Sequence, residues 1–316
     1  MSAETSKWKV AFVGQANYFD FVALSCPTPA IEPMFIEFKS NDAVDDFLDD
    51  LGQFDPDVVI VFGPQHIPTG ALADVKAIRI GWFTEPIAHI ASESEWKRIN
   101  EQKQGKTLEQ IDLERRFIDA SSCDVKQFDR LISHDPLQVP TLELFGKIWR
   151  SVPLAVDDRF YRDPCPLPET PTIGFIGRST PYREQFLTTL KHDYDLRHFA
   201  HGLFGDRLLS ELSELDIAVN LHNLEISTFE NRVPLHLAQG HLVLSQPLKP
   251  THGLEADRDF IEFSNPEELA HVVSEIFRFP NAHDLTRHRG RQKAEYFRAS
   301  VVYEKILRDL RLEHAL

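Results

Sequence analysis

Short apolar runs alternate with amphipathic segments along both halves of the chain. The apolar run WKVAFVG (8–14) ends in glycine, which is typical of a strand buried on both faces of a parallel sheet. Similar runs recur, and we predict further strands at 57–63, 77–83, 128–133, 148–152, 172–177, 196–199, 216–221 and 242–245. Strand–helix alternation of this kind predicts an α/β protein built on doubly wound parallel sheets.

The segments between the runs carry helical periodicity. NDAVDDFLDDL (41–51) has an asparagine suited to the N-cap and aspartates on its outward face. We predict further helices at 92–120, 140–146, 182–190, 208–215, 233–239 and 266–277, and a long charged helical tail at 282–312.

A proline-rich segment divides the alternation into two halves. YRDPCPLPETP (161–171) holds four prolines in eleven residues, a density typical of a linker. We therefore predict an N-terminal domain at 1–160, a C-terminal domain at 172–281 and a final helical segment at 282–316. Ligands of such domains bind outside the carboxyl ends of the strands.

Charge and composition narrow the function. The chain has 34 Lys and Arg against 49 Asp and Glu, a net charge of −15, which argues against a nucleic-acid partner. An anionic ligand would need a local cluster of arginines. Three scattered cysteines, no secretory-type leader and no long apolar run predict a cytoplasmic protein without an integral membrane segment. The chain also lacks the GxGxxG, GxxxxGK[ST], GxSxG and HExxH motifs.

A candidate anion site follows the strand at 172–177. The motif GFIGRS puts Gly177 and Arg178 directly after this strand, and Arg183 lies in the first turn of the next helix. Two guanidinium groups beside a helix N-terminus suit a diphosphate, because their forks match phosphate oxygens and the helix dipole favours negative charge. The alternative for Arg183 is a surface ion pair with Glu184 or Glu214.

A second cluster of polar residues lies in the loop NLHNLEISTFENR (220–232), between two apolar strands. We assign Asn231 and Arg232, at the start of the next helix, to the same diphosphate site. The remaining candidates would contact the nucleotide or the sugar; they are His222, Asn223, Glu225 and Glu230. The alternatives are a hydrogen-bonded core histidine and carboxylates that favour a helix start.

These segments resemble the C-terminal domain of GT-B fold glycosyltransferases, and most closely the group of CgeB-like proteins. That group carries a Gly-x-Arg-Ser turn with a downstream Arg, an NLH strand end, an NRVFEALAxG segment and a GLExGxDxxEFxDPEEL close. This chain has GFIGRSTPYRE, NLHNLEISTFENRVPLHLAQGHLVLS and GLEADRDFIEFSNPEEL, and SVPLAVDDRFY (151–161) is similar to the phrase between the family's domains. The resemblance covers 172–277, whereas the first half agrees only in pattern.

The resemblance implies two Rossmann-like domains that face each other across a cleft, with the final helix returning to the first domain. It also implies a metal-independent hexosyltransferase that moves a sugar from a nucleotide-diphosphate donor to an acceptor hydroxyl, with retention of configuration. The donor is a co-substrate, so we expect no cofactor and no bound metal. The acceptor is a glycan, a protein or a small molecule.

The chain departs from the family pattern at Leu235, where the family carries a glutamate that binds the donor ribose. A leucine cannot accept hydrogen bonds from ribose hydroxyls. Either Glu230 or His236 replaces that contact, or the ribose contact is weaker, or the chain no longer transfers sugar. The alternatives to a transferase are thus an inactive binding or scaffold protein of the same fold and a nucleotide-sugar epimerase, in which Glu225, Glu230 and Glu255 would surround the sugar.

In the first half, Glu85 and His134 follow predicted strands at their carboxyl ends, where active sites of parallel sheets form. Either is a candidate general base for an acceptor hydroxyl. Asp135 could orient His134, and the alternative for this segment is a turn closed by an Asx-type hydrogen bond. The pair Asp157–Asp158 has the look of a metal motif, but we expect no metal there.

Overall fold

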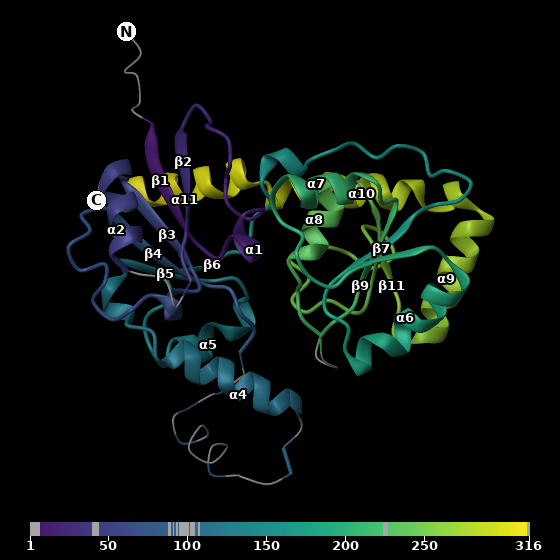
Figure 1. The fold of residues 1–316 in the computed structure, drawn as a ribbon, viewed down its shortest axis with the longest axis horizontal. Helices are drawn as coiled ribbons and strands as arrows, with labels where there is room; N and C mark the ends of the chain where they lie inside the picture. Colours follow the sequence, from purple (N-terminus) through teal and green to yellow (C-terminus); the bar gives the residue numbers. More distant parts are fainter. Residues whose placement is uncertain are drawn as a thin grey trace. The chain divides into compact units, whose positions relative to one another are not determined.

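The computed structural model describes residues 7–39, 44–87, 90, 92, 94, 101, 105–106, 108–223 and 227–314. The chain divides into two compact units. The first unit comprises residues 1–154 and 304–316, and the second unit comprises residues 155–303 (Figure 1). The division therefore falls inside the last helix, whose C-terminal part belongs with the first unit.

A six-stranded parallel sheet is the centre of the described part of the first unit. Its strand order is β2-β1-β3-β4-β5-β6, so the direction of winding reverses between β1 and β3. The strands are β1 (Trp8–Gly14), β2 (Ile31–Glu37), β3 (Val58–Phe62), β4 (Ile78–Phe83), β5 (Arg130–Ser133) and β6 (Arg150–Ser151). Every residue of β3 is buried, as the uninterrupted apolar run predicts.

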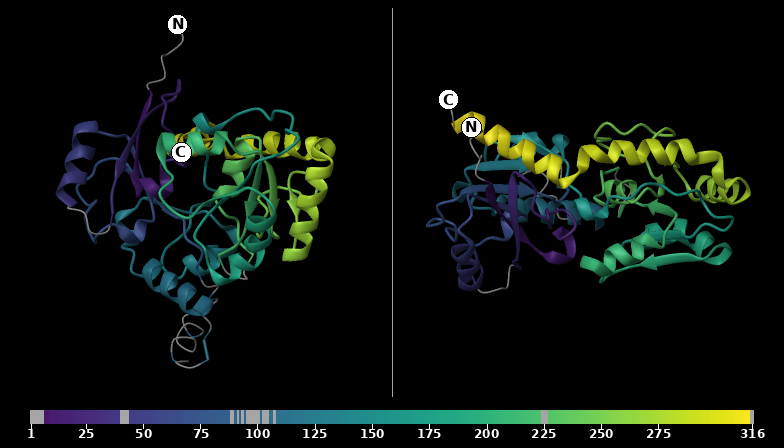
Figure 2. Two further views of the ribbon diagram at one scale, coloured as in Figure 1. Left: turned by 45° about the vertical axis from the view of Figure 1, so that its right-hand side comes forward. Right: turned by 90° about the horizontal axis from the view of Figure 1, so that it is seen from above.

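Helices cover this sheet. α2 (Val44–Phe54) buries Phe47 and Leu51 against the same core as residues of β1 and β3. The C-terminal part of α11 (Ala299–His314) lies across the opposite face (Figure 2). The remaining helices of the described part of this unit are α1 (Ala16–Phe19), α4 (Leu108–Ser121), α5 (Val139–Leu142) and the 3₁₀ turns η1 (Pro64–His66), η2 (Val125–Gln127) and η3 (Pro136–Gln138).

The second unit has a five-stranded parallel sheet among its described residues, in the order β11-β10-β9-β7-β8. Its winding reverses between β7 and β9. The strands are β7 (Ile173–Ile176), β8 (Leu196–Phe199), β9 (Ile217–Asn220), β10 (Leu242–Ser245) and β11 (Ile261–Glu262). A reversal of this kind opens a crevice at the carboxyl ends of the strands, which is where α/β proteins bind ligands.

Two layers of helices enclose the second sheet (Figures 1 and 2). α6 (Pro181–Asp193) and α9 (Pro266–Arg278) share one apolar core with the strands, and α7, α8 and α10 lie on the other face. These three helices are α7 (Gly205–Ser213), α8 (Arg232–Ala238) and α10 (Asp284–Ala294), and the 3₁₀ turns are η4 (Asp158–Phe160), η5 (Pro280–His283) and η6 (Glu295–Phe297).

The sequence reading missed β2 and β11, the two short or irregular edge strands. β2 contains Pro33, which has no N–H to donate and argues against a strand interior. Because β2 is the outermost strand, the missing donor costs no ladder hydrogen bond. β11 has only two residues, too few for a periodic signal.

The prediction of one continuous helical tail at 282–312 is wrong. α10 ends at Ala294, and the chain is extended at Arg298 before α11 begins. There the backbone pairs with Val156, whose N–H donates to Phe297 O (2.7 Å) and whose carbonyl accepts from Ala299 N (2.8 Å). Burial of Phe297 fixes this break.

Of the helix predicted at 92–120, the described part is α4, and most of 92–107 lies outside the described residues.

None of the described helices combines the length and the apolar character that a membrane span requires. The fold is instead stabilised by close packing between helices and sheet. Gly290 of α10 is an example, because a Cβ at this position would collide with the carbonyl oxygen of Asp259 and lie 2.7 Å from Leu237 Cδ2.

Gly290→Ala should lower the free energy of unfolding by about 1–3 kcal/mol, because a methyl group has no room beside rigid backbone. Gly52→Ala is the matched control, since Gly52 lies in α2 with no atom within 4 Å of an added Cβ. The control should stabilise the protein by about 0.5–1 kcal/mol through helix propensity. Urea denaturation measures both, and equal effects of the two variants would contradict this packing.

Candidate functional site

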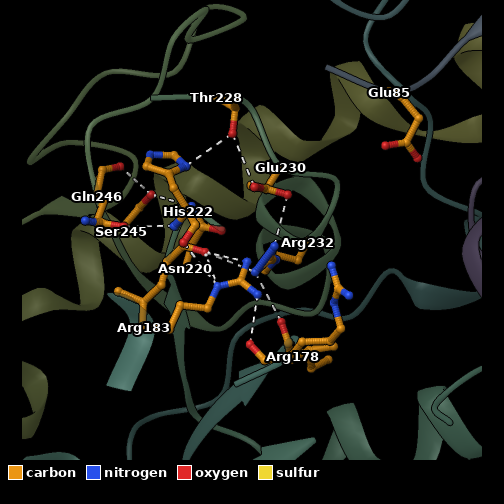
Figure 3. Close-up of polar contacts among 12 residues, drawn as sticks. Glu85, Arg178, Arg183, Asn220, His222, Thr228, Glu230, Arg232, Ser245 and Gln246 are labelled. Atoms are coloured by element: carbon orange, nitrogen blue, oxygen red, sulfur yellow. Dashed lines mark hydrogen bonds and ion pairs between the residues drawn. The ribbon is translucent and has the colours of Figure 1, made fainter. Parts of the chain in front are cut away.

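The turn after β7 brings three arginines to the reversal point of the second sheet (Figure 3). Gly177 has φ +150°, and a Cβ there would lie 3.1 Å from Arg183 Nη1 and 3.3 Å from Arg232 Nη1. Glycine is thus the residue that lets both guanidinium groups approach the backbone. His198 Nε2 donates to the Gly177 carbonyl (2.8 Å) and so fixes the turn from β8.

Arg183 is buried and bonded to backbone carbonyls. Its Nε donates to Leu221 O (3.2 Å) and His222 O (3.1 Å), Nη2 donates to Leu221 O (3.0 Å), and Nη1 donates to Arg178 O (3.0 Å). The side chain lies on α6, whose N-terminus Thr180 caps through a bond from Arg183 N. Neither surface ion pair considered for Arg183 forms, because its guanidinium joins the ends of β7 and β9.

Arg232 lies beside Arg183, and both guanidinium groups donate to the same carbonyl, Leu221 O (3.3 Å from Arg232 Nη1 and 3.0 Å from Arg183 Nη2). The guanidinium carbons of Arg183 and Arg232 are 5.4 Å and 5.8 Å from the centre of the Phe175 ring. Arg232 donates to Ile176 O (3.2 Å) and forms an ion pair with Glu230 (3.0 Å). Arg178 follows Gly177, and its side chain is exposed.

Among the described residues, the cluster has an excess of positive charge, since Glu230 is the carboxylate that forms an ion pair with one of its three arginines. Burial lowers the pKa of Arg183 to about 9; Arg232 and Arg178 add to this effect, and Glu230 opposes it. Burial by itself would raise the pKa of Glu230, but Arg232, His222 and Arg183 together with Thr228 lower it. Glu230 is therefore ionised, and the site as a whole favours an anion.

A chain of polar contacts extends from Glu230 to the end of β10. The Thr228 hydroxyl lies 3.2 Å from Glu230 Oε1 and 3.3 Å from His222 Nδ1. His222 Nε2 donates to Pro247 O (2.8 Å), and His222 N donates to Gln246 Oε1 (2.8 Å). Burial lowers the pKa of His222, so the imidazole is neutral with its proton on Nε2. These bonds hold the loop in place.

The other residues assigned to the donor differ in what they contact. Asn231 directly precedes α8, but its side chain makes no capping hydrogen bond. Asn223 has its amide oxygen buried without a hydrogen-bond partner. Glu225 lies outside the described residues. Sequence reasoning missed Thr228 and Gln246, although Gln246 follows β10 at the same sheet edge and position alone could have identified it.

The surroundings of Glu230 and His236 differ, and these are the two residues considered as replacements for a ribose-binding glutamate. Leu235 is in the core, with 2% of its surface exposed. His236 is fully buried, and its Nδ1 bonds to His241 Nδ1 (3.0 Å), while His241 Nε2 donates to Leu212 O (3.0 Å). His236 is therefore a packing residue between α8 and α7, and Glu230 alone of the two remains at the arginine cluster.

In the first unit, Glu85 and His134 have different surroundings. Glu85 lines a cavity at the carboxyl ends of β1, β3 and β4 and forms an ion pair with Arg116 (3.0 Å). His134 is buried, its Nδ1 donates to Phe83 O (3.1 Å), and it is not among the residues that line the cavity. Asp135 caps η3 by accepting from Leu137 N (2.8 Å), as the Asx alternative predicts.

The acidic pair Asp157–Asp158 has a structural role. Asp157 accepts from Arg159 N and pairs with the Arg159 guanidinium (3.0 Å), and Asp158 accepts from Ser300 N (2.9 Å) and from its hydroxyl. Among the described residues, no group of three or more His, Cys, Asp or Glu is placed to hold a metal ion.

No protein-family model matches this sequence, and no curated protein matches it. Solved structures do match. HepE (Alr3699) of Anabaena in complex with UDP has a TM-score of 0.55 at 10% identity, covering 96% of this chain and 99% of that one. Sucrose-phosphate synthase of Thermosynechococcus elongatus has a TM-score of 0.60 at 10% identity, covering 98% and 100%. A glycosyltransferase of Rickettsia africae has a TM-score of 0.52 at 11% identity, covering 96% and 97%.

Likenesses at this level of identity show the fold. The chain has the α/β architecture of GT-B glycosyltransferases, with two parallel sheets, and this prediction from the sequence is confirmed.

The buried pair His236–His241 makes stability depend on pH. Burial, together with neighbouring cationic groups, lowers the pKa of His236 well below its usual value and that of His241 to about 3. Both are neutral in the folded protein, whereas in the unfolded chain they take up protons below pH about 6.5. Stability is therefore complete above pH about 6.5 and falls with decreasing pH.

When the pH is lowered from 7 to 5, protonation of these two histidines in the unfolded chain should lower the free energy of unfolding by about 3–4 kcal/mol. Urea denaturation measures this change. The double variant His236→Leu, His241→Leu should lose most of this dependence, whatever its stability at pH 7. His288→Gln, at an exposed position on α10, is the control and should retain it. An unchanged slope in the double variant would show that the pair is not the cause.

Proposed function

We propose that this chain is a glycosyltransferase that takes a sugar from a nucleotide-diphosphate donor, with UDP as the nucleotide. The observation that carries the proposal is the arginine cluster of Arg178, Arg183 and Arg232 at the reversal point of the second sheet. A protein of net charge −15 has placed these three arginines together, with Arg183 buried and Arg232 paired with Glu230. A bound diphosphate would compensate the excess charge.

The three arginines have different roles in this proposal. Arg183 and Arg232 are held by backbone carbonyls and supply a fixed positive field. The exposed Arg178 is able to contact phosphate oxygens directly, with Gly177 keeping the turn open. Preorganised charge of this kind stabilises the negative charge that develops on the diphosphate as it leaves. In a transfer without metal, departure of this group is the main barrier.

The neighbouring polar groups would hold the rest of the donor. Glu230 is ionised, and its two oxygens retain lone pairs beyond those used by Thr228 and Arg232, so it can accept from ribose or sugar hydroxyls. His222 holds the loop through its bonds to Gln246 Oε1 and Pro247 O, and we keep Asn231, which directly precedes α8, as a contact for the diphosphate. We keep Asn223 as a contact for the nucleotide because its buried amide oxygen lacks a partner.

The comparisons support UDP as the nucleotide. HepE has been solved with UDP, with UDP and glucose, and with UDP-glucose, at TM-scores of 0.55, 0.56 and 0.56 to this chain. The segments GFIGRS, NLH and GLEADRDF favour the CgeB-like group within this fold, and with it a hexosyltransferase that is metal-independent and retains configuration.

For the acceptor side we propose Glu85 as the general base, because it lines the cavity of the first unit, whereas His134 does not. The second candidate function is a binding protein of the same fold without transferase activity. The observation that favours it is Leu235, an apolar core residue where the family has its ribose contact.

Transfer is tested by UDP release from UDP-glucose, UDP-galactose and UDP-N-acetylglucosamine with a panel of acceptor glycosides. We expect one donor to turn over, and EDTA to leave the rate unchanged. Glu85→Gln should lower kcat at least about 100-fold without changing UDP affinity, as loss of a general base does. Glu143→Gln, an exposed carboxylate of the same unit, is the control.

UDP binding without turnover of any donor would favour the binding protein instead. Formation of a free sugar epimer without an acceptor would favour an epimerase. Loss of activity in EDTA would contradict metal independence.

A further inference from the structure

The cavity of the first unit lies where the winding of the six-stranded sheet reverses. Its lining includes strand ends: Gly14 ends β1 and Gln15 follows it, Phe62 ends β3 and Gly63 follows it, and Thr84 and Glu85 follow β4. Its volume is about 60 Å³. A single water needs roughly 10–15 Å³ of such space, so the cavity has room for several waters or for one edge of a ring.

Aromatic rings form one wall of the cavity. Phe19 and Phe62 stack with their ring centres 5.0 Å apart, and Phe38 completes the inner surface. Tyr18 also lines the cavity but is 61% exposed, which places its ring at the rim. A flat ligand with an apolar face would pack on these rings.

The cavity lining also contains a polar group without a hydrogen-bond partner. Thr84 is 7% exposed, and its hydroxyl is buried without a hydrogen-bond partner. Such a group destabilises the unliganded protein and favours a ligand that can pair with it. His66, also on the cavity, is half-buried and neutral because burial lowers its pKa against the effect of Asp119.

The charges around the cavity disfavour an anion. Among the described residues that line the cavity there is no Lys or Arg, and Glu85 is the charged side chain. The cation next to Glu85 is Arg116, whose Nη1 is 3.0 Å from Glu85 and whose Nη2 is 2.9 Å from Asp112. A phosphate in this cavity would meet the Glu85 carboxylate, whose negative charge repels it.

We propose that this cavity binds the hydroxyl-bearing edge of a neutral ring, a sugar or a phenol, and that Thr84 pairs with that hydroxyl. This inference rests on the proposed function, in which the ring belongs to the acceptor. It excludes phosphorylated sugars as ligands of this cavity and makes Thr84 and Tyr18 the residues that select the acceptor.

The experiment is a calorimetric titration of the full chain with methyl glucoside, phenol and glucose 6-phosphate, with and without UDP. We expect one neutral probe to bind and glucose 6-phosphate to bind at least about 10-fold more weakly. Thr84→Val should weaken the neutral probe about 3- to 10-fold, the effect of one lost hydrogen bond. Thr84→Ser, which keeps the hydroxyl, should bind within about twofold of the original protein.

Thr69→Val, an exposed threonine of the same unit away from the cavity, is the control and should not change binding. Tyr18→Ala is a second variant at an exposed position, so it serves if Thr84→Val fails to fold; it should weaken the probe that stacks on the rim. Whether methyl glucoside or phenol binds identifies the kind of ring.

Tighter binding of glucose 6-phosphate, full affinity in Thr84→Val, or no binding of either neutral probe would overturn the inference. The UDP titration separates this failure from failure of the proposed function. UDP binding with both neutral probes silent leaves the donor site standing and removes the acceptor assignment. If a neutral probe binds in a manner that depends on Thr84 but UDP does not bind, the cavity assignment stands and the donor site is contradicted.

Discussion

The hydrogen bonds of the Arg183 guanidinium to backbone carbonyls are the interaction on which the candidate donor site depends. They join the turn after β7, at Arg178 O, to the end of β9, at Leu221 O and His222 O. These bonds therefore fix the positions of two loops relative to each other, although the bonded residues are 38 or more apart in the sequence. The absence of a side chain at Gly177 follows from this arrangement, because a Cβ would lie against the same guanidinium. The packing of two arginines on the Phe175 ring follows from it too.

This arrangement is costly without a ligand, because like charges are close together and one of them is buried. The lowered pKa of Arg183 is a measure of that cost. The rest of the molecule is acidic, so the field that attracts a diphosphate is local to this sheet edge. The cavity of the first unit has the opposite character, with aromatic rings and a carboxylate. In the proposed function, these opposite characters match an anionic donor at the arginine cluster and a neutral acceptor in the cavity.

Much of this follows from the sequence, and the reasons for the exceptions are physical. Buried parallel strands such as β3 leave continuous apolar runs in the sequence. Gly177 and Arg178 directly follow such a run and Arg232 begins a helix, so their positions could be predicted. β2 was hidden because an edge strand tolerates Pro33. The break before α11 depends on pairing with Val156, more than 140 residues away, which no local pattern records.

Individual roles were harder to predict than positions. Arg183 occupies the predicted place, but its donors bind carbonyls of a distant loop. His236 and His222 have the same side chain in neighbouring segments. One is a packing residue, whereas the other anchors the loop, since burial and partners decide between these roles. Thr84 carries no motif, and it is the unpaired hydroxyl in a cavity that distinguishes it.

The measurement that tests the central claim most directly is a ³¹P NMR titration of UDP with the full chain and with Arg178→Ala. The account predicts saturable shifts of both phosphorus resonances, because the diphosphate lies on the arginine cluster. Arg178→Ala should weaken the affinity about 10- to 100-fold, as expected for a lost charged hydrogen bond. Arg207→Ala, an exposed arginine of α7, should leave it unchanged. Unshifted phosphorus resonances at millimolar protein, or equal affinity in Arg178→Ala, would contradict the account.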